Sequence, residues 1–208
     1  MKALTYCKIK DGIDPTQICT RLDCREYVEE IMKRKSRASI NESCAALFLL
    51  AKTLEDEFNE DTSILKYKKD EHGRPYFENR EDISFSLSHS GEYAVCAVTT
   101  EGDVGVDIEK TPTDEKRERT EKIKERFFSE KEKSRAEKSG KGFATVWTRK
   151  EAYYKYNGGR SHELDSENDK SVAYDNFEIA EEYIVTVCRD NIKSEAFSVP
   201  REIKSRIF

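Results

Sequence analysis

Two acidic residues stand two positions apart in an otherwise apolar segment of the chain. Asp107 and Glu109 follow Val104 in the run Val-Gly-Val-Asp-Ile-Glu. Side chains of a β-strand alternate between its two faces, so both carboxylates are expected on the same face. Like charges in that arrangement repel each other unless a cation lies between them. The oxygen atoms of such a pair suit a hard cation such as Mg²⁺, although an exposed edge strand with acids paired to lysines is the more common explanation.

A second group that could do chemistry lies in the segment Trp147–Lys155, which reads as one helix. Glu151 and Lys155 are four residues apart and therefore share a helix face. A third group is the Ser-His-Ser triplet 88–90, which is expected in a turn between two strands. Each group also has an ordinary structural explanation, because glutamate–lysine pairs are frequent on helix surfaces and serine is frequent in turns.

Hydrophobic periodicity predicts the elements that position these groups. The most apolar helix is expected at 43–58, with Asn41 or Ser43 as its N-cap. Ser129 and Glu132 predict a capping box for a later helix. The expected helices span 24–37, 43–58, 120–128, 129–138 and 142–156. The expected strands span 3–9, 83–88, 93–100, 104–109, 172–179, 182–190 and 194–200, and the second to fourth of these are expected to form an antiparallel meander. The expected loops span 70–77 and 157–171.

A short internal repeat divides these elements into two sets. The sequence Glu-Tyr-Ala-Val-Cys-Ala-Val at 92–98 is similar to Glu-Tyr-Ile-Val-Thr-Val-Cys at 182–188, and each copy follows one long apolar helix. We therefore predict an α+β fold made of a pseudo-twofold pair of similar halves, each a small, mainly antiparallel sheet packed on a long helix. The expected halves are residues 1–104 and 105–208, within one compact unit. A cleft between such halves is a preferred place for a small-molecule site.

The composition of the chain argues against several classes of protein. The 208 residues carry a formal net charge of -5, so a general nucleic-acid-binding protein is not expected. No apolar run is as long as a membrane span, and no apolar N-terminal segment is typical of a signal peptide. The six cysteines lack a C-x-x-C pair and the three histidines are scattered. We therefore expect reduced thiols, a cytoplasmic location, no membrane partner and no histidine-rich metal site.

Four motifs in a fixed order give the chemical groups a more specific meaning. They are Gly73-Arg74-Pro75, the Gly-Val-Asp-Ile-Glu segment 105–109, the Arg-Phe-Phe-Ser segment 126–129 with Glu132, and the segment Trp147–Lys155. Their order and spacing resemble those of the surfactin-synthetase-type (group II) 4′-phosphopantetheinyl transferases. The signature of that family is similar to G-[IV]-D-[IV]-E followed by W-[ST]-x-K-E-[AS]-x-x-K. The resemblance is close over residues 70–158 and looser on both sides.

This resemblance implies a reaction, a substrate and a partner. Enzymes of the family transfer the 4′-phosphopantetheine group of coenzyme A to a serine hydroxyl of an acyl or peptidyl carrier protein. The reaction is Mg²⁺-dependent and releases 3′,5′-ADP. The family fold has two α+β halves with coenzyme A in the cleft, which agrees with the internal repeat. Because the two halves supply both walls of the cleft, a monomer is expected.

The resemblance also implies roles for the acidic and basic groups described above. Asp107, Glu109 and Glu151 resemble the Mg²⁺ ligands of the family. Glu151 is also expected to be the general base that takes the proton of the carrier serine, directly or through water. Lys155 resembles the lysine that faces the phosphates of coenzyme A and stabilises the leaving group.

Further residues are implied in binding coenzyme A. Ser88 and His89 are similar to a phosphate-contacting turn, in which His89 reaches the 3′-phosphate. Arg74 and Pro75 resemble the loop on the adenine side. The residues expected to support the site from behind are Glu132 and Lys150.

The chain departs from the family pattern in two places. Ser43 stands where an arginine is expected, and the basic residues of the segment 33–37 are candidates to replace it. The segment 157–160 reads Asn-Gly-Gly-Arg, where the family usually has a sequence like G-x-G-L. These departures concern coenzyme A affinity and the choice of carrier more than the type of reaction.

Two other functions stay open on the sequence alone. A Mg²⁺-dependent nucleotide phosphohydrolase would use the same acids without a carrier protein. A non-catalytic adaptor that binds carrier proteins would keep the fold without turnover. The presence of all three acids together with Lys155 favours the transferase.

Overall fold

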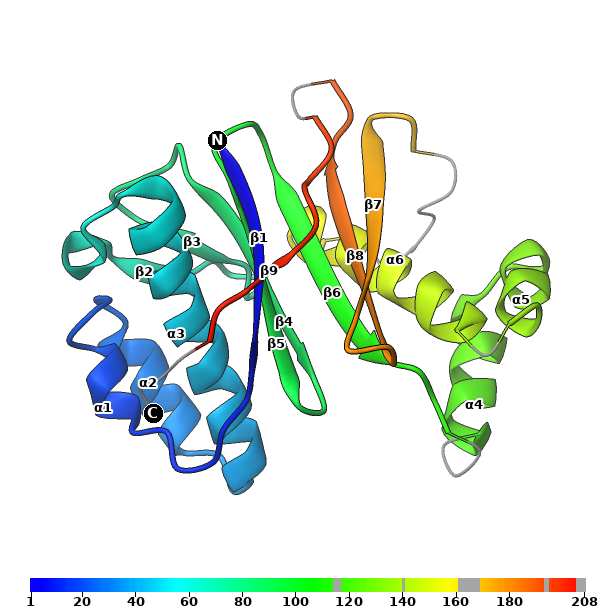
Figure 1. The fold of residues 1–208 in the computed structure, drawn as a ribbon, viewed down its shortest axis with the longest axis horizontal. Helices are drawn as coiled ribbons and strands as arrows, with labels where there is room; N and C mark the ends of the chain where they lie inside the picture. The colour runs from blue at the N-terminus through cyan, green and yellow to red at the C-terminus, as the bar shows by residue number, and fades with distance from the viewer. Residues whose placement is uncertain (114–116, 140, 161–168, 193–194, 205–208) are drawn as a thin grey trace.

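The computed structural model describes residues 1–113, 117–139, 141–160, 169–192 and 195–204 (Figure 1). The helices are α1 Pro15–Ile18, α2 Arg25–Met32, α3 Arg37–Phe58, α4 Arg117–Phe127, α5 Glu130–Glu137 and α6 Gly142–Tyr156, with a 3₁₀ turn at Thr62–Ile64. The strands are β1 Lys2–Lys8, β2 Tyr67–Lys69, β3 Pro75–Phe77, β4 Ser84–Ser90, β5 Tyr93–Thr99, β6 Val104–Lys110, β7 Val172–Ile179, β8 Tyr183–Asp190 and β9 Arg201–Glu202. Parts of the loop expected at 157–171 and of the strand expected at 194–200 lie outside the described residues, and the described part of the latter is not a strand.

The first sheet has the strand order β4-β5-β1-β9 and carries α3 on one face (Figure 1). α3 begins where the Ser36 side chain accepts a hydrogen bond from the backbone N–H of Ser39, and it ends at Asn59 in the left-handed conformation. The expected N-caps Asn41 and Ser43 were wrong, because Ser36 caps the helix earlier and both residues lie buried within it. The helix is buried over most of its surface, which explains its apolar sequence.

The second sheet has the order β6-β8-β7 and packs on α6, the helix that carries Glu151 and Lys155. Helix and strand approach each other closely at Gly105. A Cβ atom at Gly105 would lie 2.0 Å from the carbonyl oxygen of Ala152 and 2.4 Å from the backbone nitrogen of Tyr156. Glycine is therefore required at this position to bring the acids of β6 beside Glu151 of α6.

The two sheets repeat one unit, a strand followed by a long helix and two more strands. β1-α3-β4-β5 and β6-α6-β7-β8 place their last strand between the other two. The pairing register is also repeated, since Lys8 pairs with Tyr93 and Lys110 pairs with Tyr183 at the same end of each unit. The rings of Tyr93 and Tyr183 meet edge to face, with centroids 5.0 Å apart. The predicted α+β fold with similar halves is confirmed, whereas the division between residues 104 and 105 stays a prediction.

A buried pair of threonines joins helix to sheet in each unit. The hydroxyl oxygens of Thr5 on β1 and Thr53 on α3 lie 2.6 Å apart. Those of Thr148 on α6 and Thr186 on β8 lie 2.7 Å apart. Thr53 and Thr148 also donate a hydrogen bond to the carbonyl oxygen four residues earlier in their helices. The two units are therefore similar in these side-chain contacts as well as in their strand register.

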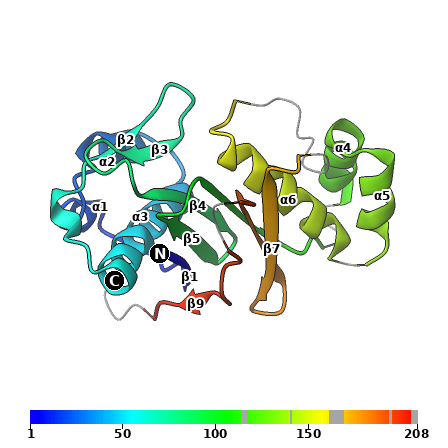
Figure 2. The ribbon, with the colours of Figure 1, turned by 90° about the horizontal axis from the view of Figure 1, so that it is seen from above.

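The two sheets pack face to face, with α3 and α6 on the outer sides (Figure 2). Side chains of β5 alternate between the core under α3, to which Cys96 belongs, and the core between the sheets, to which Val95 belongs. After β8 the chain crosses from the second sheet to the first. Phe197 enters the core between the sheets, and Ile203 enters the core under α3 beside β9. No helix of the described residues is long and apolar enough to span a bilayer.

The expected meander of three strands was wrong at its third strand. β6 pairs with β8 and belongs to a different sheet from β4 and β5. β4 and β6 are instead joined by serine side chains. The Oγ atom of Ser86 accepts a hydrogen bond from the backbone N–H of Val106 at 3.0 Å, and that of Ser90 accepts one from Lys110 at 3.3 Å. Side-chain hydroxyls of β4 thus connect the two sheets, whereas the predicted backbone pairing of β6 with β5 does not occur.

Candidate active site between the two halves

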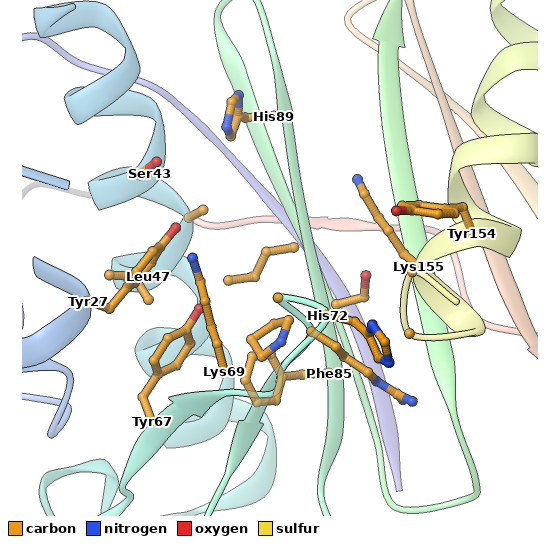
Figure 3. Close-up of a pocket in the computed structure, with 18 residues that line it drawn as sticks. Tyr27, Ser43, Leu47, Tyr67, Lys69, His72, Phe85, His89, Tyr154 and Lys155 are labelled. Atoms are coloured by element: carbon orange, nitrogen blue, oxygen red, sulfur yellow. The ribbon is translucent and has the colours of Figure 1, made fainter. Parts of the chain in front are cut away.

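A cleft of about 880 Å³, open to solvent, lies between the two repeated units (Figure 3). α3 and the β2–β3 segment form one wall, the end of α6 forms the other, and Phe85 of β4 lies between them. Leu87 of β4 also lines the cleft. The polar and charged residues most relevant to a ligand are Ser43, Lys69, Arg74, His89, Tyr154 and Lys155. Four of the predicted coenzyme A-binding residues, Arg74, Pro75, His89 and Lys155, line this one cleft.

Asp107 is 5% exposed and lies behind Lys155, the cleft-lining residue to which it is bonded. Its Oδ1 atom accepts hydrogen bonds from the Nζ of Lys155 and from the Oγ of Ser88, both at 2.7 Å. Its Oδ2 atom is buried and has no hydrogen-bond donor among the described residues. A buried carboxylate oxygen without a donor is energetically costly, and a cation would remove that cost.

Glu109 and Glu151 have less exposed surroundings than ordinary surface acids. Burial, followed by the charge of Asp107, raises the pKa of Glu109 to about 7, while Ser90 and Lys155 oppose the rise. Burial and Asp107 also raise the pKa of Glu151, which Lys155 partly offsets. All three acids therefore interact through Asp107, as their positions on β6 and α6 suggested.

These acids fit the ligand chemistry of Mg²⁺, because the donors are all oxygen and one of them is unsatisfied. In the described part of the chain, no three acidic, histidine or cysteine side chains converge closely enough to hold an ion by themselves. Magnesium commonly keeps several waters and shares substrate phosphates, so an incomplete protein shell suits this ion. The assignment of Asp107, Glu109 and Glu151 as ligands stays a prediction.

Lys155 lies one helical turn after Glu151, as the sequence predicted, and lines the cleft (Figure 3). Besides Asp107, its Nζ atom donates to the carbonyl oxygen of Val106 at 3.1 Å. An ammonium group has three donors, so one N–H is left for a ligand after these two bonds. Gly158 and Gly159, which follow α6 with positive φ angles, bring the chain back against the β2–β3 turn beside Arg74.

Ser88 and His89 lie within β4, so the prediction that they form a turn was wrong. The turn follows at 91–92, and the alternation of β4 places the two side chains on opposite faces. His89 lines the cleft, with its Nδ1 atom 3.5 Å from a carboxylate oxygen of Glu42. Partial burial lowers the pKa of His89, and Glu42 opposes that effect. Ser88 faces the other way and donates its hydroxyl to Asp107.

Arg74 and Pro75 lie where the β2–β3 turn meets the cleft. The Nη2 atom of Arg74 bonds to the carboxylate of Asp103 at 2.5 Å, which connects this turn to the residue before β6. The backbone of the turn is fixed by Asp70, whose side chain accepts bonds from the N–H groups of His72 and Arg74. The β2–β3 turn is therefore tied to the β5–β6 connection beside the cleft.

Glu132 and Lys150 form a buried ion pair behind the site. Their side chains are each 5% exposed, and the Nζ–Oε1 distance is 2.9 Å. The other oxygen of Glu132 accepts a hydrogen bond from the backbone of Ser129, and the predicted capping box of α5 is confirmed. The pair joins α5 to α6 at the residue immediately before Glu151.

Two basic residues near the cleft were not identified by the motifs. Arg34 donates to the Oγ of Ser43 at 2.7 Å, so it brings a guanidinium group to the position where an arginine was expected. Lys69 lines the cleft with its Nζ atom 3.9 Å from the centroid of the Tyr27 ring. The signals were present as the basic segment 33–37 and the lysines before the β2–β3 turn, but their sequence positions alone could not place them in space.

Comparison with known proteins supports the motif-based recognition. Residues 103–199 match the family model of the 4′-phosphopantetheinyl transferase superfamily. The chain is 37% identical over 112 residues to the 4′-phosphopantetheinyl transferase gsp of Aneurinibacillus migulanus, covering 51% of this chain and 44% of that relative. It is 32% identical over 124 residues to the transferase Sfp of Bacillus subtilis strain 168, covering 57% and 53% respectively.

A third relative is the 4′-phosphopantetheinyl transferase AcpT of Salmonella typhi, which is 36% identical over 102 residues, or 46% of this chain and 51% of AcpT. The matched segments span about half the length of these curated relatives. The matched part of the chain contains β6 and α6, which carry the three acids and Lys155. This part is similar to proteins of the 4′-phosphopantetheinyl transferase superfamily.

Proposed function

We propose that this protein transfers the 4′-phosphopantetheine group of coenzyme A to a serine hydroxyl of an acyl or peptidyl carrier protein and releases 3′,5′-ADP. The observation that carries the proposal is the contact between Asp107 and Lys155, because Lys155 lines a cleft with further cationic residues and Asp107 interacts electrostatically with Glu109 and Glu151. Such a cleft suits a ligand with a diphosphate group and an additional phosphate. The similarity to named transferases supports the same reaction.

The acids would hold Mg²⁺ through the free Oδ2 of Asp107 and the carboxylates of Glu109 and Glu151. When bound, this ion would neutralise charge on the diphosphate during phosphoryl transfer. The protein side chains would hold the reacting groups in position and accept the proton of the serine hydroxyl. In the proposed step the serine oxygen bonds to the phosphorus attached to pantetheine, and the bond from that phosphorus to the oxygen of 3′,5′-ADP breaks.

Glu151 is proposed to hold the proton that leaves the serine hydroxyl. Its burial beside Asp107 raises its pKa, which makes it a stronger base than an exposed glutamate. Lys155 is proposed to direct its remaining N–H towards the leaving phosphate while its other two donors stay bound to Val106 and Asp107. Both side chains then act from adjacent turns of α6.

The nucleotide end of coenzyme A is proposed to lie towards α3 and the β2–β3 turn. His89 and Arg34 bring positive or protonatable groups beside Ser43, where the 3′-phosphate would bind. Arg74 and Pro75 would border the adenine. The apolar side chains of Phe85 and Leu87 provide a floor between the two ends of the ligand.

The protein is further proposed to act as a monomer in the cytoplasm. One chain supplies both walls of the cleft, so a second copy is not needed to complete the site. All six cysteines are free, which is compatible with a reducing compartment. The carrier protein would bring its serine to the open side of the cleft near Glu151.

The test is incubation of the protein with coenzyme A, Mg²⁺ and an apo carrier protein, followed by intact-mass measurement of the carrier. We expect the carrier to gain the mass of one phosphopantetheine group, and omission of Mg²⁺ should prevent the gain. Release of 3′,5′-ADP in the absence of any carrier would instead identify a phosphohydrolase. Binding of the carrier protein without modification of the carrier and without release of 3′,5′-ADP would identify an adaptor.

A further inference from the structure

Serines occupy alternate positions along the whole of β4, which reads Ser-Phe-Ser-Leu-Ser-His-Ser from Ser84 to Ser90. Alternation places Phe85, Leu87 and His89 on the opposite face, where they line the cleft. A strand with one polar face of this kind would normally present it to water. Here the serine face meets β6, the strand that carries two of the three acids.

The serine contacts follow a regular order along the two strands. Ser86 accepts from the backbone of Val106, and Ser90 accepts from the backbone of Lys110. Between and beside these bonds, the hydroxyl of Ser88 donates to Oδ1 of Asp107 at 2.7 Å, and that of Ser90 donates to Oε2 of Glu109 at 3.2 Å. Each acid of β6 is therefore contacted by its own serine.

A hydroxyl can accept a hydrogen bond from a backbone amide and at the same time donate one to a carboxylate. Ser90 uses both capacities, because it accepts from the amide of Lys110 and donates to the neighbouring Glu109. The bonds of Ser88 and Lys155 to one oxygen of Asp107 leave its other oxygen buried and without a donor. The serines thus fix β6 and restrict the rotation of the carboxylates at the same time.

We propose that Ser88 and Ser90 are positioning residues that hold the carboxylates of Asp107 and Glu109 in the orientation needed to bind a divalent cation. This inference rests on the proposed function, because it takes the acids of β6 to be a cation site. It assigns Ser88 a role towards Asp107 instead of a contact with coenzyme A. Residues that orient metal ligands commonly change metal affinity by about 10- to 100-fold when they are removed.

The experiment measures Mn²⁺ binding to the full chain by electron paramagnetic resonance, with Mn²⁺ as the probe and no other ligand. We expect Ser88→Ala and Ser90→Ala each to weaken Mn²⁺ binding by about tenfold. Ser90→Thr keeps a hydroxyl on a strand and should restore the affinity. Thr5→Val is the matched control, since it removes the buried hydroxyl pair between Thr5 and Thr53 far from the acids and should leave Mn²⁺ binding unchanged.

A second measurement follows the strand contact without any metal. Amide hydrogen exchange at Lys110 should become faster in Ser90→Ala and stay unchanged in Thr5→Val, because only the former removes the acceptor of that N–H. Unchanged exchange at the backbone amides that pair β6 with β8 in Ser90→Ala would show that this variant is folded.

Three outcomes are distinct. Wild-type affinity in both alanine variants would overturn the positioning role while leaving the cation site intact. An equal loss in Thr5→Val would also overturn it, since the effect would then follow from general destabilisation. No Mn²⁺ binding by the wild-type protein, either alone or in a repeat of the measurement with coenzyme A present, would reject the cation site itself, and the positioning role with it.

Discussion

The two oxygen atoms of Asp107 have opposite surroundings. One oxygen accepts bonds from Ser88 and Lys155, whereas the other is buried with no donor among the described residues. The hydrogen bonds to Oδ1 hold the side chain in place, and Oδ2 is left to bind a cation. A single residue therefore connects β4, β6 and α6 at the point where chemistry is proposed.

Glu109 leads to a prediction for stability in the absence of divalent metal. Its pKa rises from 4.5 to about 7 in the folded protein, so the folded state binds its proton more tightly than the unfolded state. The free energy of unfolding should therefore fall as the pH rises from about 4.5 to about 7, and the loss should be complete above that range. Urea unfolding in a chelating buffer at about pH 5 and about pH 8 measures this change.

The comparison variant is Glu109→Gln, which cannot ionise. Its unfolding free energy should fall less between the two pH values than that of the wild-type protein. The remaining fall is expected from Glu151, whose pKa is raised for similar reasons. An identical fall in wild type and variant would contradict the position assigned to Glu109.

Glu151→Gln should lower the transfer rate by at least about 100-fold, because glutamine cannot hold the serine proton. The far-ultraviolet circular dichroism spectrum should stay unchanged, since the substitution preserves size on an intact helix. Glu130→Gln, at an exposed position of α5, is the control and should transfer at the wild-type rate. Normal turnover by Glu151→Gln would remove this residue from the proposed step.

At the scale of elements, the site depends on how α6 is held between β6 and α5. Gly105 allows the helix backbone to touch β6, and the ion pair of Lys150 with Glu132 attaches α5 on another side. The positions of Glu151 and Lys155 therefore depend on the contacts of Gly105 and Lys150, two residues that have no proposed role in the reaction itself. The helix works as a rigid support for both side chains.

Lys150→Met should lower the free energy of unfolding by about 3 kcal/mol, because it leaves the buried carboxylate of Glu132 without its partner. The double variant Lys150→Met/Glu132→Gln should recover most of that loss, since glutamine carries no charge and still completes a capping box. Urea unfolding of the three proteins measures both effects. Equal stability of the single and double variants would show that an unpaired charge is not the cause.

The elements were predictable where their signal was local. α6 was expected at 142–156 and spans Gly142–Tyr156. Its position was predictable because the signal for a helix lies within the segment itself. The capping box of α5 was equally local. The contact of β4 with β6 was not predictable, since it is made by serine side chains between two sheets, whereas three nearby strands suggest one sheet in which β6 pairs with β5.

At the scale of the whole molecule, the site exists because two similar units face each other. The internal repeat predicted these units, and the shared strand order and register show why the short match at 92–98 and 182–188 was informative. Lys69 lines the cleft and Arg34 contacts Ser43 in its lining, and neither position could be predicted, because it depends on how separate segments approach each other after folding. The sequence motifs identified the three acids, whereas the positions of the basic residues Arg34 and Lys69 became clear only from the structure.

The central claim is that the acids of β6 and α6 meet the diphosphate of coenzyme A in this cleft. A crystal structure of the protein with coenzyme A and Mg²⁺ tests it most directly. We predict that the diphosphate lies between Lys155 and the carboxylates of Asp107 and Glu151, with the metal on the free oxygen of Asp107. A diphosphate bound outside the cleft, or carboxylates turned away from it, would contradict the claim.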